Sequence, residues 1–237
     1  ANLSLKALKK GKHVFVEKPM AINRDETKSI SEFYDSDSES KPILFTGFNR
    51  RFSPFSNEIR NFTNERINPL FITYRMNAGY AETDHWIHED GGRIIGEGCH
   101  IIDLMTSFVN DTIVSISCES LNPNNSKFIS SDNKSFIIKY NDGSIANVQY
   151  FSTGSSKISK EYMEIHFDNK SIIMDDYKSL KGYGVKINEL KSSISSKGHK
   201  EQLIAFYDSL KGNTNNWPIE LWDMMQTTES TFIISEM

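Results

Sequence analysis

Residues 11–19 have the sequence Gly-Lys-His-Val-Phe-Val-Glu-Lys-Pro, and this stretch decides the fold. Residues 13–16 form a short apolar, β-branched run, which is typical of a buried strand in a parallel sheet. Gly11 ends the helix-like segment before it, because glycine adopts positive φ without strain. The strand delivers Lys18 to its carboxyl end, where open α/β sheets place ligands. Pro19 biases Lys18 towards an extended conformation, from which its ammonium can reach a substrate hydroxyl.

The composition of the chain excludes several classes of protein. Its 237 residues are 38% hydrophobic and 11% aromatic, enough for one large domain or two modest ones. The net charge is −4 and no basic stripe is present, which argues against nucleic acid as the main partner. No run approaches the ~20 apolar residues of a membrane span, and no signal peptide is recognisable. Two cysteines, Cys99 and Cys118, suit a reducing cytosol, so we expect a cytoplasmic protein with no membrane partner.

The chain begins with Ala-Asn-Leu and not with Met. Leu3, Ala7 and Leu8 stand at helical spacing, so the predicted strand follows a helix almost at once. A parallel strand needs neighbouring strands in its sheet. We therefore expect the chain to be the downstream piece of a longer protein.

Residues 1–48 alternate between helix and strand. Asn23 is a suitable N-cap for a second helix, with Glu26 three residues on as its capping-box partner. A second apolar strand follows over residues 42–48. This order is that of the C-terminal end of a doubly wound α/β sheet. No G-x-G-x-x-G motif occurs anywhere in the chain.

Residues 49–237 favour an α+β domain around a large, mainly antiparallel sheet. Residues 141–144, Asn-Asp-Gly-Ser, contain Asp-Gly, which is the best short signal of a hairpin. Residues 49–52, Asn-Arg-Arg-Phe, mark the junction with the preceding segment. We expect strands over residues 69–76, 112–117, 135–140, 145–151, 162–167, 171–174 and 185–190. We expect helices from Pro54, over 101–109, over 202–210 with Gly212 as its stop, and within 218–237.

Residues 91–104 form a second informative stretch. Four glycines stand within eight residues and indicate tight turns. They lead into a helix whose first turn carries His100 and Asp103 on one face. An imidazole beside a carboxylate is suited to general acid–base work, because its pKa can be tuned near neutrality. The alternatives are a capping histidine with a structural aspartate and, for Lys18, a lysine on a solvated edge.

Three motifs, in this order, resemble the glucose–fructose oxidoreductase, inositol dehydrogenase and rhizopine catabolism (Gfo/Idh/MocA) family. They are the stretch at 11–19, Gly-Phe-Asn-Arg-Arg-Phe at 47–52, and Gly-Gly…Gly-Cys-His-Ile-Ile-Asp-Leu at 91–104. Order and spacing match over the whole chain. The Gly-Gly-Arg-Ile-Ile-Gly-Glu form of the third motif is similar to members that form the second half of two-part dehydrogenases near polysaccharide-biosynthesis genes.

The resemblance implies a fold and a set of partners. Residues 1–48 would be the C-terminal part of a Rossmann NAD(P)-binding domain, whose first strand and glycine-rich turn this chain lacks. Residues 49–237 would be the substrate-binding domain, forming a homodimer or homotetramer through the open face of its sheet. The expected cofactor is NAD or NADP in the complete protein. The expected partner is a small sugar substrate, with no nucleic acid.

The resemblance also implies roles for individual residues. Lys18 matches the lysine that contacts the nicotinamide ribose and the substrate hydroxyl, with Glu17 and Pro19 beside it at the cofactor. His100 matches the histidine that handles the proton as hydride moves to the nicotinamide. Arg51 matches an arginine that lines the site.

Two carboxylates complete the expected site. Asp103 matches a carboxylate near the substrate. Many family members carry Asp four residues before the histidine, and Gly96 occupies that position here. Glu97 is next to it and is a candidate substrate-binding residue, although we expect its side chain to point in a different direction from that of the missing Asp.

Residues 85–90, His-Trp-Ile-His-Glu-Asp, leave three interpretations open. Two histidines with carboxylates can hold zinc; Trp86 and His85 can stack on a sugar ring; or the segment packs as an ordinary loop. We predict no metal site and take Trp86 as a candidate substrate contact. Cys99 stands beside His100 as in a Cys/His nucleophile, but we expect it to be a small packing residue.

These patterns lead to one leading function and one alternative. We expect an NAD(P)-dependent oxidoreductase that acts on a sugar or nucleotide-sugar hydroxyl in polysaccharide biosynthesis, with Lys18 and His100 as catalytic residues. The chain by itself is expected to be inactive, because its dinucleotide site is incomplete. The alternative is a non-catalytic dimerisation or sugar-binding module built on the same fold.

Overall fold

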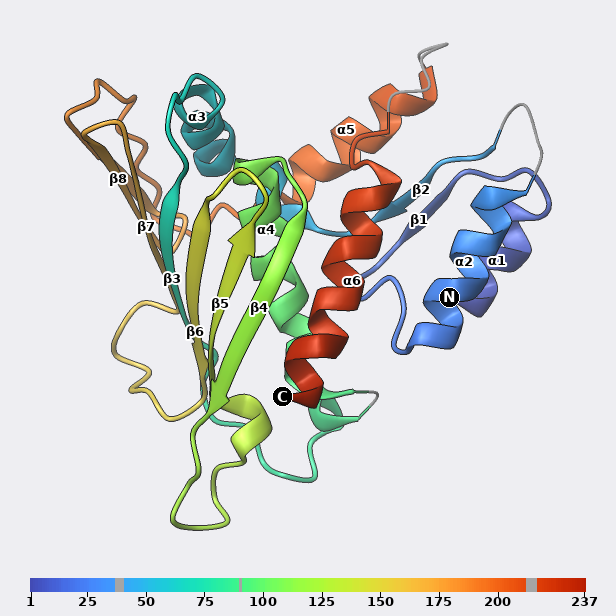
Figure 1. Cartoon of the computed structure of the whole chain (residues 1–237), viewed down its shortest axis with the longest axis horizontal. Coiled ribbons are helices and arrows are strands. Elements are labelled where there is room, and N and C mark those ends of the chain that lie inside the picture. Colours follow the sequence, from blue (N-terminus) through green and yellow to red (C-terminus); the bar gives the residue numbers. More distant parts are fainter. Residues whose placement is uncertain (37–40, 90, 212–216) are drawn as a thin grey trace.

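A computed structural model describes residues 1–36, 41–89, 91–211 and 217–237 of the chain. A small parallel sheet with two helices lies at one side of the molecule and a large sheet lies at the other (Figure 1). Helix α6 (Leu221–Glu236) runs between the two sheets and packs against α4 (Cys99–Val109). The residues at this junction come from segments far apart in the sequence.

The small sheet confirms the helix–strand alternation expected for residues 1–48. Its elements are α1 (Asn2–Leu8), β1 (Val14–Val16), α2 (Arg24–Asp35) and β2 (Leu44–Thr46). β1 and β2 pair in parallel, with Val14 opposite Leu44. Gly11 has a φ of +68°, as expected for the residue that ends α1. The expectation of a buried first strand is wrong in part, because β1 is half-buried and pairs only with β2 in the described part of the chain.

The start of α2 shows why its sequence forms a helix there. The side chain of Asn23 accepts a hydrogen bond of 2.9 Å from the backbone N–H of Glu26. The Glu26 carboxylate in turn accepts one of 3.0 Å from the N–H of Ile22. Both contacts satisfy donors that a helix start leaves free. The predicted N-cap is therefore confirmed, with the return contact one residue earlier than in a standard capping box.

The large sheet confirms the predicted α+β domain. Its strands are β3 (Phe71–Asn77), β4 (Ile113–Ser120), β5 (Lys134–Tyr140), β6 (Ile145–Phe151), β7 (Glu161–Phe167), β8 (Lys170–Asp175) and β9 (Ser179–Tyr183). They lie in the order β4-β5-β6-β3-β7-β8-β9, and every pairing except β3–β6 is antiparallel. The β7–β8 turn places Asp168 and Asn169 at positive φ, the conformation of a tight hairpin.

One predicted strand is wrong. Residues 185–190 do not form a strand, and the last strand is β9, which pairs with β8. The apolar residues of this segment serve the core instead of a sheet, since Ile187 is buried in the main core and Val185 and Leu190 pack against it. The apolar run thus indicated that the segment is buried, but a pattern of apolar residues alone does not show whether a buried segment also pairs in a sheet.

Helices α3 (Pro54–Thr63), α4 and α6 contribute to the core on one face of the large sheet, whereas α5 (His199–Lys211) packs Phe206 against the core of the small sheet. Between these helices lie a 3₁₀ turn η1 (Asn49–Phe52) and a π-helical turn η3 (Ile94–Gly98). In β5, Phe136, Ile138 and Tyr140 are buried while Ile137 and Lys139 on the other face are exposed. The predicted stop at Gly212 lies outside the described residues. Among the described helices, none is long and apolar enough to cross a membrane.

Candidate active site

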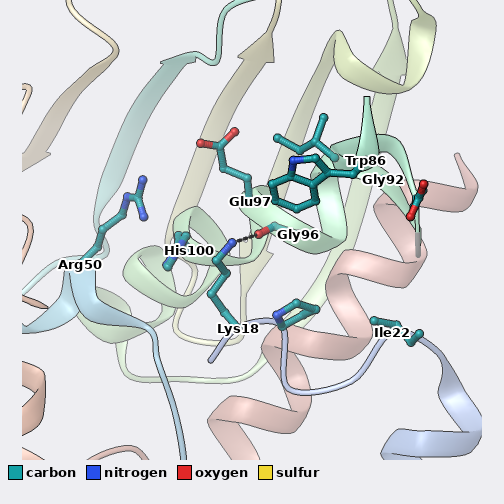
Figure 2. A pocket seen from close by; sticks show the side chains of 11 residues that line it. Lys18, Ile22, Arg50, Trp86, Gly92, Gly96, Glu97 and His100 are labelled. Atoms are coloured by element: carbon teal, nitrogen blue, oxygen red, sulfur yellow. Dashed lines mark hydrogen bonds between the residues drawn. The ribbon is translucent and has the colours of Figure 1, made fainter. Parts of the chain in front are cut away.

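A cavity of about 320 Å³ lies where the small sheet meets the large domain. Lys18 and Pro19 enter it from the end of β1, and Arg50 enters from η1 (Figure 2). A π-helical turn and the start of α4 supply Gly96, Glu97 and His100. The mouth is formed by Ile22, Trp86, Ile87, Glu89 and Gly92. The carboxyl end of a parallel strand therefore opens on this cavity, as expected for a ligand site.

Lys18 reaches across the cavity to the turn before α4. Its Nζ donates a hydrogen bond of 2.6 Å to the carbonyl oxygen of Gly96 (Figure 2). Gly96 lies inside the π-helical turn, a feature that often occurs at functional sites. In the part of the chain that the structure describes, no carboxylate lies within ion-pair distance of this ammonium. Lys18 thus presents a positive charge held only by a neutral oxygen.

His100 lies in the first turn of α4 and is only 6% exposed. Its ring packs edge-on against Phe48, with the centroids 6.3 Å apart, and its Nδ1 has no hydrogen-bond partner among the described residues. Burial lowers the pKa of His100 well below the usual histidine value, and the cations Arg50 and Lys18 lower it further. The imidazole is therefore neutral at pH 7, the state in which it can accept a proton.

Arg51 and Asp103 do not line the cavity. Arg51 donates to Asp103 at 2.9 Å through Nε and at 2.5 Å through Nη2. Its Nη2 also donates to Asp223 of α6 at 2.8 Å. All three side chains are buried. The carboxylate expected beside His100 serves Arg51 instead, because the interior offers Asp103 a bidentate cationic partner.

Arg50 is the cavity residue that sequence reasoning missed. Its Nε and Nη2 donate to Glu161 at 2.7 Å and 2.9 Å. Glu161 is fully buried and also accepts from Lys197 at 2.5 Å and from the Tyr74 hydroxyl. The motif Asn-Arg-Arg-Phe pointed to two adjacent arginines, but nothing in it shows which one faces the ligand. The 3₁₀ turn decides this, because it sends consecutive side chains in different directions.

Glu97 and Trp86 lie on the cavity wall and at its mouth. Glu97 accepts hydrogen bonds of 2.6 Å from both the Tyr150 hydroxyl and Lys160, and Arg93 lies 3.4 Å away. Burial raises the pKa of Glu97, but the nearby cations and hydrogen bonds lower it by more, so it falls below the usual value. Trp86 is 70% exposed, which leaves its ring free for a ligand.

The segment 85–90 shows no metal site in the residues that can be assessed. Nδ1 of His88 lies 3.6 Å from Oδ1 of Asp132, but no group of three possible ligands gathers in the described part of the chain. Asp90, which the zinc interpretation included, lies outside the described residues. Cys99 is buried beside the small sheet, as a packing residue would be.

A family model agrees with this geometry. Residues 67–233 match the model of an oxidoreductase family's C-terminal α/β domain. The chain belongs to the Gfo/Idh/MocA oxidoreductase family. The match covers every strand of the large sheet and the third of the three sequence motifs, so the family resemblance is confirmed.

Individual members of the family are similar to the chain at low sequence identity. It is 29% identical over 118 residues to scyllo-inositol 2-dehydrogenase (NAD(+)) of Bacillus subtilis (strain 168), a match to 49% of this chain and 34% of the relative. The chain therefore spans about a third of the length of this curated relative.

Solved structures of the family share the fold. UDP-N-acetylglucosamine 3-dehydrogenase GnnA from Acidithiobacillus ferrooxidans matches 99% of the chain with 73% of its own, at a TM-score of 0.77 and 14% identity. Levoglucosan dehydrogenase in complex with NADH matches 100% of the chain with 74% of its own, at a TM-score of 0.75 and 17% identity. An oxidoreductase from Thermotoga maritima matches 99% with 70% of its own, at 0.73 and 20% identity. At such identities the likeness concerns the fold.

Proposed function

We propose that the chain belongs to an NAD- or NADP-dependent oxidoreductase that moves hydride between the nicotinamide and a hydroxyl of a sugar or nucleotide sugar. The observation that carries this proposal is that one cavity receives both Lys18 and His100, from segments far apart in the chain. The names of the relatives, dehydrogenases of an inositol, a nucleotide sugar and an anhydrosugar, support the substrate class. Residues 1–48 would be the end of the nucleotide-binding domain and residues 49–237 the substrate domain.

The residues present fit the nicotinamide end of such a cofactor. The cavity opens at the carboxyl end of β1, where Pro19 forms part of the wall and Lys18 offers an ammonium. The carboxylate of the exposed Glu17 lies beside Gly47, where an added Cβ would lie 3.1 Å from its Oε2. The chain contains no glycine-rich phosphate loop. We therefore assign Glu17, Lys18 and Pro19 to the nicotinamide side of the site.

In the proposed reaction, Lys18 and His100 share the proton of the substrate hydroxyl. The ammonium at Nζ of Lys18 holds the hydroxyl oxygen and stabilises negative charge that develops there. The neutral imidazole of His100 takes the proton in the direction of oxidation and returns it in the direction of reduction. Bound NAD(P) accepts or supplies the hydride.

Glu97 and Trp86 would hold the sugar. The Glu97 carboxylate is fixed by three donors, so it offers a rigid acceptor to a substrate hydroxyl. Trp86 offers an apolar ring face at the mouth. Arg51 and Asp103 would act at a distance, by holding η1 and therefore Arg50 in place.

We also propose that the chain forms a homodimer or homotetramer through the open face of the large sheet. Phe71, Ile137 and Tyr183 are exposed on the face that α4 and α6 do not cover. They stand on three strands that are not neighbours, so exposed apolar side chains are spread over much of this face, as on a face that a second subunit could cover. Sedimentation of the protein with Ile137→Glu, compared with Lys28→Glu on the exposed surface of α2, tests this assignment.

A turnover assay tests the proposed function. The complete gene product is mixed with NADH or NADPH, and binding is followed by the fluorescence of the reduced cofactor. A panel of sugars and nucleotide sugars is then screened for oxidation with NAD or NADP. Enhanced fluorescence and hydride transfer with at least one sugar support the proposal. Sugar binding without any cofactor binding supports the non-catalytic sugar-binding module instead.

A further inference from the structure

We infer that the substrate is an acidic sugar, whose carboxylate lies against Arg50 while its reacting hydroxyl lies at Lys18 and His100. This inference rests on the proposed function and narrows its substrate class. The inference is based on a difference in net charge between the two sides of the cavity.

The first excess of positive charge comes from a cluster formed by Arg50, Lys197 and Glu161. Arg50 and Lys197 both bind Glu161, so two cations share one carboxylate. Tyr74 adds a hydroxyl but no charge. Nε and Nη2 of Arg50 donate hydrogen bonds to Glu161, whereas its Nη1 donates to no acceptor among the described residues. A buried guanidinium group at the cavity wall therefore retains a donor for a ligand.

The second positive charge is that of Lys18. Its only hydrogen-bond partner in the described part of the chain is the carbonyl oxygen of Gly96. Figure 2 shows His100 between this ammonium and the guanidinium of Arg50. Burial lowers the pKa of His100, and the charges of Arg50 and Lys18 lower it further, which agrees with their nearness to the ring. This side of the cavity thus carries an excess of two positive charges, because the carboxylates that line the cavity, Glu89 and Glu97, lie at its mouth and on its opposite wall.

The opposite wall is balanced. The carboxylate of Glu97 faces Lys160 and Arg93, and Arg93 is shared with the buried Asp132. Glu89 lies at the mouth and is exposed, where solvent screens its charge. The cavity therefore favours an anion on the side of Arg50 and neutral hydroxyl groups next to Glu97.

The size and depth of the cavity favour a carboxylate on the sugar over a nucleotide diphosphate. A volume of about 320 Å³ is at the small end of ligand sites. Arg50 and His100 are 5% and 6% exposed, so the unbalanced charge lies at the bottom of the cavity. A diphosphate attached to a nucleoside would have to remain at the mouth, where Trp86 and Glu89 lie. A planar carboxylate on the ring can accept a hydrogen bond from Nη1 of Arg50, and the positive charge of Lys18 adds to the attraction.

Calorimetric titration of the chain with D-glucuronate and with D-glucose, without cofactor, tests the inference. We expect glucuronate to bind roughly tenfold or more tightly than glucose, with a preference that weakens as salt is added. The variant Arg50→Gln is expected to lose most of this preference, and Arg50→Lys to keep part of it. The control Lys28→Gln removes a lysine that is 75% exposed on α2 and should change nothing.

Several outcomes would overturn the inference. Glucuronate binding no tighter than glucose binding, with failure of both to bind included, removes the acidic sugar. Competition with inorganic phosphate and with UDP gives a second outcome. If either one binds more tightly than glucuronate, the positive charge of the cavity serves a phosphate instead of a carboxylate. The comparison of ligands on the unmodified chain stays decisive if Arg50→Gln fails to fold. Turnover of neutral sugars by the complete protein would leave the proposed function intact while this inference failed.

Discussion

Lys18 and Gly96 stand 78 residues apart in the sequence, and the Lys18 ammonium donates a 2.6 Å hydrogen bond to the Gly96 carbonyl oxygen. This contact joins the end of β1 to the π-helical turn before α4. A Cβ added to Gly96 would meet no atom within 4 Å, and its φ lies outside the left-handed region. A side chain can therefore be placed beside Lys18 and one turn before His100 without displacing the backbone.

Gly96→Asp is expected to raise the pKa of His100. A carboxylate one helical turn away favours the imidazolium, by about one pKa unit or more, and so opposes the burial that lowers this pKa now. Oxidation needs the neutral imidazole, so its onset with rising pH should move to higher pH. NMR titration of the histidine ring protons measures the shift directly. Gly96→Ala is the uncharged control, and equal titration of His100 in the two variants would contradict the assignment.

Lys18→Met is expected to remove most of the turnover of the complete protein. Loss of a group that stabilises the developing oxyanion and shares the proton costs roughly a hundredfold or more in kcat. Binding of the reduced cofactor, followed by its fluorescence, should be retained. Lys28→Gln, at an exposed position on α2, serves as the control for a lost lysine charge. Unchanged turnover in Lys18→Met would rule out the proposed role.

Glu161 is expected to make the fold sensitive to acid. Burial raises the pKa of Glu161, but Arg50 and Lys197 outweigh this effect and hold its pKa at about 2, below the ordinary 4.5. A carboxylate with a depressed pKa stabilises the fold above its unfolded pKa, and that contribution is lost as pH falls through the folded pKa. About 3 kcal/mol should therefore disappear between about pH 4.5 and pH 2.

Urea unfolding at a series of pH values measures this loss. Glu161→Gln should be less stable at pH 7 and should depend less on pH in the same window, because glutamine does not titrate. An equal acid dependence in the variant and the unmodified chain would show that other carboxylates are responsible.

Arg51→Met is expected to destabilise the fold by about 3–5 kcal/mol, because it leaves buried carboxylates without their partner. Asp103 and Asp223 both bind this guanidinium and are almost fully buried. Arg24→Gln is the contrasting variant, since Arg24 binds Glu229 and Glu236 on the surface, where water screens the charges. Urea unfolding should show a much smaller change for Arg24→Gln, and similar losses for the two variants would contradict the buried network.

Local sequence patterns predicted most of the elements. The N-cap Asn23, the helix stop at Gly11 and the hairpin turn at residues 141–144 act through neighbouring backbone groups, so their signals are local. The alternation in β5 likewise reflects one buried face. The strand predicted at residues 185–190 was wrong because its signal, a run of apolar residues, is not specific to strands. Loops that are buried need apolar residues as well.

The sequence by itself determined most of the order of helices and strands and the family, and it singled out Lys18 and His100 as candidate site residues. Only the tertiary structure decided that Arg50 faces the cavity and that Asp103 pairs with Arg51 away from it. The physical reason is the distance along the chain over which each interaction acts. Turns, caps and strand alternation depend on groups a few residues apart, whereas the partner of a buried charge comes from wherever the fold brings a counter-ion.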